Sequence, residues 1–453
     1  MPRRYNLSFF GLVGAIMVAL KLKEHVDGYD RVSSDEDGHG RVALQDTPAA
    51  PTYRDEPARE GEEGVALLDT ELPTTQRPKR KRQGGCCACI CCGVNLSLFC
   101  KALGIATLLF TLYGAIKLIM WAVSPTPTGL ENMPAFSTSL GCQSASHLYQ
   151  GSEFTVNVSP GSRGEHALDV SGSSAVGTIT LVEAPIDATD IQYTMTVRTT
   201  DESLLERINL RYPKTDPDMT DSRLILSTPQ ITDTNTCMRY DITMHIPKTL
   251  KKLHVAPHTL AHVQFHPDAH LELENLIVTL FAMNNKNMLL PSQNAVAKKL
   301  KLEVYRGWIV GDISLFSSAM ITTQRGDGVA NVRVHPTAPI DLLHPELEVA
   351  ELQTTTGAGR TDITYISDRG LPHRRIKSTH MSSRNGDVYL TYREAEFSGR
   401  VALTSKSYST TGLTPVNRNT TTGGDSKWTH WVGEESGVDE LVVNSRGWTG
   451  LYF

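Results

Sequence analysis

The pattern of apolar and polar positions divides the chain into a helical N-terminal part and a longer β-rich part. Leu7–Leu20 and Ala102–Val123 are largely apolar runs, whereas segments beyond Gly141 alternate apolar and polar residues. Unbroken apolar runs favour helices, and period-two alternation rich in Val, Ile and Thr predicts strands with one buried face. We therefore expect a mainly β fold that follows a membrane helix.

The run Ala102–Val123 has the properties of a membrane-spanning helix. Its length matches the roughly 20 residues that an α-helix needs to cross a bilayer. Its only charged residue is Lys117, about two turns from the end, where a long side chain can reach the headgroups. Trp121 stands where aromatic residues gather at membrane interfaces. We predict one transmembrane helix over residues 102–123.

The charges that flank this helix predict its orientation. No Lys or Arg occurs in the stretch from Ser124 to Ser139. The cations all precede the helix: Arg77, Lys79, Arg80, Lys81, Arg82 and Lys101. Because cytoplasmic flanks carry the excess of Lys and Arg, the N-terminal part is predicted to be cytoplasmic and the C-terminal part extracellular or lumenal.

The first 76 residues form two predicted segments. Residues 1–23 contain an apolar run that is too short for an ordinary membrane span. Four interpretations stay open: a signal-peptide core, a second membrane-inserted element, an interfacial helix, or a mis-assigned start of translation. Residues 24–76 are strongly acidic and poor in aromatic residues, which predicts a disordered cytoplasmic region. Within it, "SSDEDG" offers Ser33 and Ser34 to an acid-directed kinase.

A basic and cysteine-rich patch over residues 77–101 lies immediately before the helix. A zinc site would need a second ligand pair on an intervening fold, which this stretch lacks. Cysteines beside a membrane helix and a basic run are suited to S-acylation (palmitoylation), since the cations attract anionic headgroups. The predicted lipidation sites are Cys86, Cys87, Cys89, Cys91 and Cys92.

The part beyond the helix is predicted to comprise a linker and two β-rich stretches. Residues 124–141 are rich in Pro, Ser and Thr, and residues 142–297 alternate as short strands. From residue 298 to 453 the strands recur with Gly-Asp pairs at presumptive turns, as in Gly311-Asp312 and Gly386-Asp387. Such recurrence favours a β-solenoid (β-helix), in which each strand packs only on its neighbours. A β-sandwich is the alternative.

These Gly-Asp turns, each followed by "DISL", "DVYL" or "VANVRV", resemble the adhesin-like families of β-helical surface proteins. Together with the acidic region, the cysteine patch and the single span, they resemble uncharacterised fungal single-pass membrane proteins with such an outer domain. The resemblance covers roughly residues 77–453. It implies a role at a surface and defines no functional residue.

Candidate site residues are sparse in the β-rich part. Cys142 and Cys237 are expected to form a disulfide if this part lies outside the cytosol. Asn157 and Asn419 begin glycosylation sequons under the same topology, which would make the chain a glycoprotein. His262 and His266 are weak metal candidates, because they share one face of a predicted strand and a polar outer face is the simpler interpretation.

The motifs and charge favour a non-catalytic protein. We find no GxSxG, HExxH, phosphate-binding loop or dinucleotide turn, and no cofactor is expected. The formal net charge of −5 over 453 residues does not favour a nucleic-acid partner. The prediction is a membrane-anchored surface protein for adhesion, binding or envelope structure, with the lipid bilayer and a polysaccharide or surface protein as partners. The alternative is a carbohydrate-active enzyme, a lyase or glycosidase on a β-helix scaffold.

Overall fold

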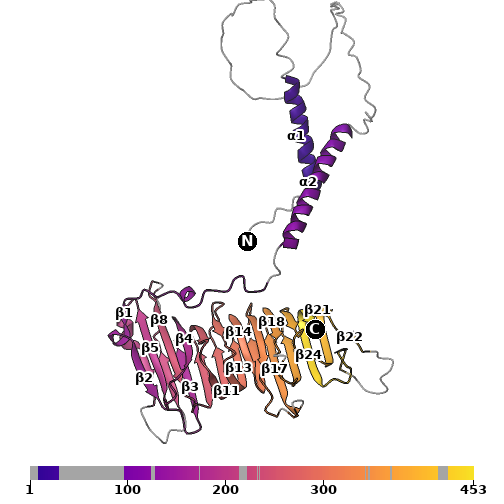
Figure 1. Cartoon of the computed structure of the whole chain (residues 1–453). Helices are drawn as coiled ribbons and strands as arrows, with labels where there is room; N and C mark the ends of the chain where they lie inside the picture. Colours follow the sequence, from indigo (N-terminus) through magenta and orange to yellow (C-terminus); the bar gives the residue numbers. More distant parts are fainter. Residues whose placement is uncertain are drawn as a thin grey trace, which may run out of the picture. The chain divides into compact units, whose positions relative to one another are not determined.

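The computed structural model forms two compact units, Met1–Thr126 and Pro127–Phe453 (Figure 1). It describes residues 9–29, 96–123, 128–172, 174–213, 222–231, 233, 235–341, 343–344, 347–367, 370–416 and 427–453. The predicted acidic region, the cysteine patch before residue 96 and Asn419 therefore lie outside the described residues.

The first unit contains two helices, α1 (Phe9–Tyr29) and α2 (Leu96–Val123). Within the described part of the chain, one segment, Phe99–Met120 in α2, is long and apolar enough to cross a membrane, with a mean hydropathy of 1.9. Helix α2 begins before the predicted Ala102. Its hydroxyl groups are satisfied locally, since Thr107 donates to the Leu103 carbonyl at 2.8 Å. A lipid-facing segment needs such internal pairing because hydrocarbon offers no partners.

Helix α1 packs against α2 through small side chains. Val13 forms a buried cluster with Ala102 and Ala106, and neighbouring apolar side chains of α1 border it. Because Ala102 and Ala106 lie on successive turns of α2 and are small, the backbones of the two helices can approach closely. The N-terminal apolar run is thus helical and contacts α2, while Lys21 and Lys23 occupy its more polar second half.

The second unit is mainly β, as the alternation predicts. Among the described residues, 24 strands belong to one mixed sheet that is not closed. The strands are β1 (His147–Leu148), β2 (Phe154–Val158), β3 (Glu165–Ser171), β4 (Ala175–Glu183), β5 (Ile191–Thr199), β6 (Asn209–Arg211), β7 (Arg223–Ser227), β8 (Met238–Ile246), β9 (Lys252–Pro257), β10 (Leu260–Phe265), β11 (Leu271–Leu280), β12 (Met288–Leu290), β13 (Ala295–Val304), β14 (Trp308–Leu315), β15 (Ser318–Thr323), β16 (Val329–Pro336), β17 (Val349–Thr356), β18 (Arg360–Tyr365), β19 (Arg375–Ser382), β20 (Asp387–Thr391), β21 (Gly399–Thr411), β22 (Thr414–Pro415), β23 (His430–Val432) and β24 (Asp439–Tyr452).

From β9 to β20, successive strands alternate between two rows, and the strands within each row pair in parallel (Figure 1). The first row pairs β4, β10, β12, β14, β16, β18 and β20 in that order. The second row pairs β3, β9, β11, β13, β15, β17 and β19. From β9 to β20, strands two places apart in the chain therefore hydrogen-bond to each other in parallel.

Strand β24 belongs to both rows. Its first half pairs with β19, with Lys377 opposite Glu440, and its second half pairs with β20, with Tyr389 opposite Gly450. Strand β21 then pairs along β24, with one register shift between Ser405 and Ser407. One continuous strand thus passes from one row to the other at the C-terminal end.

The core lies between the rows and consists of ladders of inward side chains. Val278, Leu302 and Ile321 occupy equivalent positions on successive strands of the second row, and each is at most 1% exposed. Fully burying such a side chain stabilises a fold by about 1.5–3 kcal/mol. The alternation seen in the sequence therefore places one side of each strand in this core.

The parallel pairing begins earlier than residue 298. Strands β3 and β4 already pair in parallel with β9 and β8. At this end β5 runs antiparallel between β2 and β8, and β1 pairs with β5. The antiparallel strands interrupt the repeat, which explains why the sequence pattern is clear only in the later part.

The predicted Gly-Asp turns divide into two kinds. Gly386 directly precedes β20, as expected. Gly311, in contrast, lies inside β14 with φ +151°, and a Cβ there would stand 2.5 Å from the Pro291 carbonyl oxygen. The Gly311-Asp312 turn prediction is wrong, because this glycine accommodates a close backbone approach within a strand.

Replacing Leu302 by Ala is expected to lower the free energy of unfolding by about 2–5 kcal/mol, since it opens a cavity in an inward ladder. Lys299→Ala, on the outer face of the same strand, is the matched control and is expected to change it by no more than about 0.5 kcal/mol. Chemical denaturation of the full chain measures both. Equal effects would contradict the assignment of inward and outward faces.

Candidate binding surface

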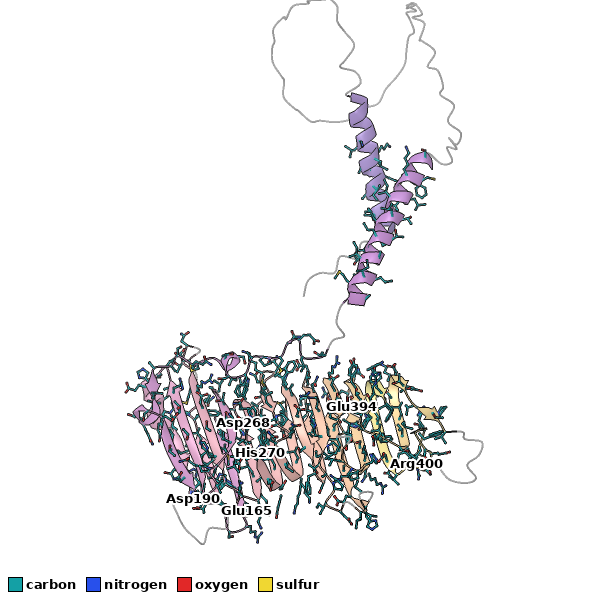
Figure 2. The ribbon with its side chains drawn as sticks, viewed as in Figure 1. Glu165, Asp190, Asp268, His270, Glu394 and Arg400 are labelled. Atoms are coloured by element: carbon teal, nitrogen blue, oxygen red, sulfur yellow. A yellow bond between two sulfur atoms is a disulfide. The ribbon has the colours of Figure 1, made fainter. Side chains whose placement is uncertain are left out.

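A row of charged and polar side chains crosses the outer face of the second row. Residues in register on neighbouring strands form this charged ladder: Glu165, Lys252, Asn275, Lys299, Ser318, Glu351, Lys377, Glu440 and Arg400. Figure 2 labels its two ends, Glu165 and Arg400, at opposite ends of the row. The ladder therefore extends along the whole row.

Opposite charges alternate along the charged ladder. Lys377 Nζ lies 3.2 Å from Glu351 Oε1, and Lys252 Nζ lies 3.7 Å from Glu165 Oε2. Exposed pairs of this kind contribute only about 0–1 kcal/mol each to stability. The ladder holds four cations and three carboxylates, so it has no strong single-sign field that would attract nucleic acid. It is a flat polar surface whose side chains stay at least partly exposed, where a partner can contact them.

The outer face of the first row is partly covered by the segment Thr128–Cys142, which we call the strap. Residues 124–141 were expected to be a linker. However, three apolar side chains of the strap, Leu130, Met133 and Phe136, pack on the β unit. They contact Met288, Trp308 and Val329. These last three residues are in register on β12, β14 and β16. The strap thus follows one outward ladder of the sheet.

A buried arginine holds the far end of the strap. The Arg239 guanidinium donates to the carbonyl oxygens of Ser137 at 2.9 Å and Gly141 at 3.0 Å. It also pairs with Asp241, at 2.8 Å. Arg239 is 3% exposed, so its charge is compensated by a carboxylate and by carbonyl dipoles rather than by water.

The Cys142–Cys237 disulfide lies beside this arginine. The two Cα atoms are 5.9 Å apart, and the bond joins the end of the strap to the residue before β8. It closes a loop across a sequence separation of 95 residues. A covalent tie over such a loop restricts the unfolded chain, which stabilises the fold.

His262 is part of the strap contact, not of an exposed polar face. Its Nδ1 accepts the Ser137 N–H at 2.9 Å, and its Nε2–H donates to the Lys286 carbonyl at 2.9 Å. A backbone N–H can only donate and a carbonyl can only accept, so the ring is neutral with its proton on Nε2. Burial lowers the pKa of His262 to about 4.

These contacts leave His262 without a lone pair for a metal. His266 lies just past the end of β10, where its Nδ1 stands 3.9 Å from an Asp268 carboxylate oxygen. Within the described residues, no group of three or more His, Cys, Asp or Glu side chains could hold a metal ion. The two histidines are therefore not brought together as a ligand set.

Two other histidines lie inside the β unit, each between hydroxyl groups. His166 contacts the Ser222 Oγ at 2.7 Å and the Tyr193 hydroxyl at 2.5 Å. His380 contacts the Thr354 Oγ1 at 2.8 Å and the Tyr392 hydroxyl at 2.9 Å. Burial lowers the pKa of each ring to about 3. Hydroxyls can donate or accept, so they satisfy neutral imidazoles without supplying a counter-charge.

His373 has the opposite environment. Its Nε2 lies 3.0 Å from a carboxylate oxygen of Asp439, which is fully buried and also accepts the Ile376 and Ser398 N–H groups at 2.8 Å. The hydrogen bond to Asp439 raises the pKa of His373. This pair therefore stabilises the fold below the unfolded pKa near 6.5, and that contribution is lost as pH rises through the raised value.

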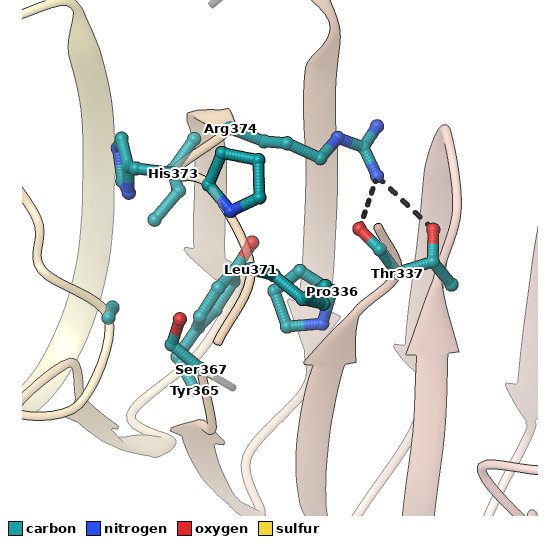
Figure 3. Close-up of a pocket in the computed structure, with 10 residues that line it drawn as sticks. Pro336, Thr337, Tyr365, Ser367, Leu371, His373 and Arg374 are labelled. Carbon is teal, nitrogen blue, oxygen red and sulfur yellow. Dashed lines mark hydrogen bonds between the residues drawn. The ribbon is translucent and has the colours of Figure 1, made fainter. Parts of the chain in front are cut away.

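His373 and Arg374 line a pit between the strands (Figure 3). Arg374 donates to the Thr337 carbonyl at 3.2 Å, as the dashed lines in the figure show. The pit measures about 20 Å³, which is room for one water rather than for a sugar ring. Its histidine and arginine are engaged with Asp439 and Thr337, which is typical of a structural role.

Of the other predicted sites, Asn157 is exposed on β2, a strand that pairs only with β5 among the described residues. Its side chain is therefore accessible to a glycan. The predicted lipidation sites, the second sequon at Asn419 and the serines Ser33 and Ser34 all lie outside the described residues.

The chain matches no family model and no curated protein. Two solved structures are similar to it. One is a candidate cell adhesion protein from Clostridium sporogenes, with 10% identity, a TM-score of 0.22, and coverage of 66% of this chain and 98% of that chain. The other is a candidate adhesin from Parabacteroides merdae, with 10% identity, a TM-score of 0.24, and coverage of 54% and 96%. At these TM-scores the likeness supports no conclusion about this chain.

The buried histidines predict a steep loss of stability in acid. Their folded-state pKa values lie below the unfolded value near 6.5, so the unfolded state takes up protons first and stability falls as pH drops from about 6.5 toward 4. Each ring contributes up to about 1.4 kcal/mol per pH unit. His380→Gln is expected to reduce this slope in denaturant titrations at a series of pH values.

The matched control is His270→Gln, because that side chain is exposed to solvent. We expect the control to retain the slope of the unchanged chain between pH 6.5 and 4. An identical slope in the His380 variant would show that protonation of the buried ring does not drive acid unfolding.

Proposed function

We propose that this chain is a single-pass membrane protein whose β unit, Pro127–Phe453, acts outside the cytosol as a non-catalytic scaffold for adhesion or binding. The observation that carries the proposal is the charged ladder. It offers a flat polar surface, fixed by backbone pairing, along a complete row of strands. Flat faces of this kind suit an extended or multivalent partner, such as a surface polysaccharide or another surface protein.

The two parallel rows support a β-solenoid that makes one turn for each pair of strands. Chain order alternates between the rows, and β24 pairs with both of them in a single strand. An antiparallel Greek-key sandwich, the alternative expected from sequence, pairs its neighbours differently. In a solenoid the outer faces are free of core packing and can differ from rung to rung.

The proposed topology rests on two independent features. The cations before α2 and their absence just after it favour a cytoplasmic N-terminus. The Cys142–Cys237 disulfide favours an oxidising compartment for the β unit, because cytosolic thiols are kept reduced. Under this topology the cysteines before the helix, Cys86 to Cys92, are proposed acyl acceptors, and exposed Asn157 is a proposed glycosylation site.

Attachment of vesicles carrying the full chain tests this function. We expect them to attach to surfaces coated with the same chain or with polysaccharide, and to release no reducing ends from the polysaccharide. Lys252→Glu combined with Lys377→Glu is expected to reduce attachment several-fold, because it replaces alternating charges by runs of one sign. Each reversal removes an exposed pair worth about 0–1 kcal/mol and sets like charges opposite each other at a similar cost of about 0.2–1 kcal/mol, so we expect the fold to be retained.

Arg325→Glu is the control for the reversal of charge, since Arg325 is exposed in the turn between β15 and β16, outside the charged ladder. It is expected to attach as the unchanged chain does. Steady release of reducing ends would instead support the carbohydrate-active enzyme, and attachment unaffected by the ladder variant would remove the ladder from the proposal.

A further inference from the structure

A cluster of rings lies on the outer face of the first row near its C-terminal end. The Tyr389 and Trp448 ring centroids are 4.7 Å apart, on the neighbouring strands β20 and β24. On β18, the Arg360 guanidinium carbon lies 3.9 Å from the centroid of the Tyr389 ring. We call Arg360, Tyr389, Trp448 and Tyr452 the aromatic shelf.

A glycine lets the Trp448 side chain lie close against the sheet. Trp448, Gly450 and Tyr452 occupy successive outward positions of β24, because Thr449 and Leu451 between them are fully buried. A Cβ on Gly450 would lie 2.5 Å from Cη2 of Trp448. The outer edge of the six-membered ring therefore fills the space into which a side chain at Gly450 would project, and the indole stays partly exposed.

The core does not require these rings. Inward positions of the same strands are taken by Val388, Leu390 and Leu451, each at most 1% exposed. Tyr389, Trp448 and Tyr452 stay partly exposed on the outside. Outward positions of a sheet are usually polar, so a group of rings there needs an explanation beyond packing.

Polar groups border the shelf, and their charges balance. Arg360 pairs with Asp362 through two bonds of 2.6 and 2.8 Å. The Asp387 carboxylate accepts the backbone N–H of Trp448 at 3.4 Å, and the Arg393 guanidinium lies 5.8 Å from the Tyr452 ring. On the opposite side, β21 places exposed Ser407 and Ser409 next to Trp448 and Gly450. Glu131 of the strap also lies near the Arg360–Asp362 pair. Donors and acceptors thus surround the rings without an excess of positive charge.

We propose that the aromatic shelf binds a pyranose ring of a neutral glycan. A pyranose has one face of C–H groups, which packs on a flat aromatic ring, and hydroxyls around its edge, which suit neighbouring Ser, Asp and Arg groups. Nucleobases also stack on rings, but their phosphates need an excess of cations, and here two arginines meet three carboxylates, Glu131, Asp362 and Asp387. The lack of excess positive charge favours an uncharged ligand.

This inference rests on the proposed function, because it names a partner class and a site on the same scaffold. The shelf is held before any ligand arrives. Tyr389 is fixed between Arg360 and Trp448, and Arg360 is fixed by Asp362. Binding to such a preformed surface costs little ordering of side chains.

The test uses the full chain in lipid nanodiscs, which avoids sugar-based detergents. Cellohexaose, chitohexaose and a mannose hexasaccharide are titrated separately by isothermal calorimetry. We expect saturable binding of at least one of them. Trp448→Ala is expected to weaken that binding by about five- to tenfold, as loss of one aromatic contact predicts.

Gly450→Ala is the second variant, and it retains the indole. Its added methyl group displaces the free end of the Trp448 side chain, so the fold is kept while the ring can no longer occupy the space over residue 450. We expect a similar loss of affinity. Trp428→Ala is the matched control, because that partly exposed tryptophan stacks with Lys427, at 4.3 Å, outside the shelf. It is expected to bind as the unchanged chain does.

Two results would overturn the glycan site: no saturable binding of any of the three hexasaccharides, or binding unchanged in both Trp448→Ala and Gly450→Ala. If vesicle attachment through the charged ladder persists in either case, only the glycan site falls. If attachment is also lost, the proposed function falls with it. Circular dichroism of each variant shows whether a loss of binding reflects unfolding.

Discussion

Parallel backbone pairing between strands two places apart in the chain is the constraint on which the β unit depends. The pairing sets inward side chains in register within each row, and the apolar sides of the two rows then face the shared core. The inward ladder of Val278, Leu302 and Ile321 shows the result, since each of these side chains is at most 1% exposed. Stability in such an arrangement is shared between neighbours rather than held in one centre.

The same pairing sets the outward side chains in straight ladders. On the second row this aligns Glu165 with Arg400 and every charged or polar group between them. On the first row it aligns apolar residues under the strap and aromatic residues beyond it. Each outer face therefore carries a different chemistry on the same backbone, and a partner meets a surface that is already ordered.

The strap joins this scaffold to the chain that comes from the first unit. It is held by side-chain packing, by the Arg239 guanidinium and by the Cys142–Cys237 disulfide. The disulfide lies at the end of the strap that enters the β unit, so a pull on the strap would be borne there by a covalent bond. This arrangement suits a domain that stays attached while its outer faces bind.

The sequence predicted the helix α2 and the β-rich unit well, because both depend on local patterns of apolar residues. It did not predict the strap, since the segment is rich in Pro, Ser and Thr and the residues that hold it are 95 or more positions away in sequence. The spacing of Leu130, Met133 and Phe136, three residues apart, was the signal that could have indicated a buried side. His262 was assigned to a polar face for the same reason, because the strap that covers it is distant in sequence.

The sequence pattern also could not predict where the parallel pairing starts or that Gly311 lies inside a strand. Antiparallel β5 interrupts the repeat early in the unit. Gly311 is explained only by the Pro291 carbonyl, which follows the neighbouring strand β12. The sequence shows that aromatic residues are frequent near the C-terminus. It could not predict that they form one surface, because Arg360, Tyr389 and Trp448 meet only across three strands of the fold.

The central claim is that the β unit lies on the side of the membrane opposite the basic and cysteine-rich patch. Protease protection tests it most directly. It uses intact vesicles with the cytoplasmic face outward and separate tags at the two ends of the chain. The account predicts that protease added from the cytoplasmic side removes the N-terminal tag and leaves the C-terminal tag and the whole β unit intact. Digestion of the β unit from that side would contradict it, together with the proposed role at a surface.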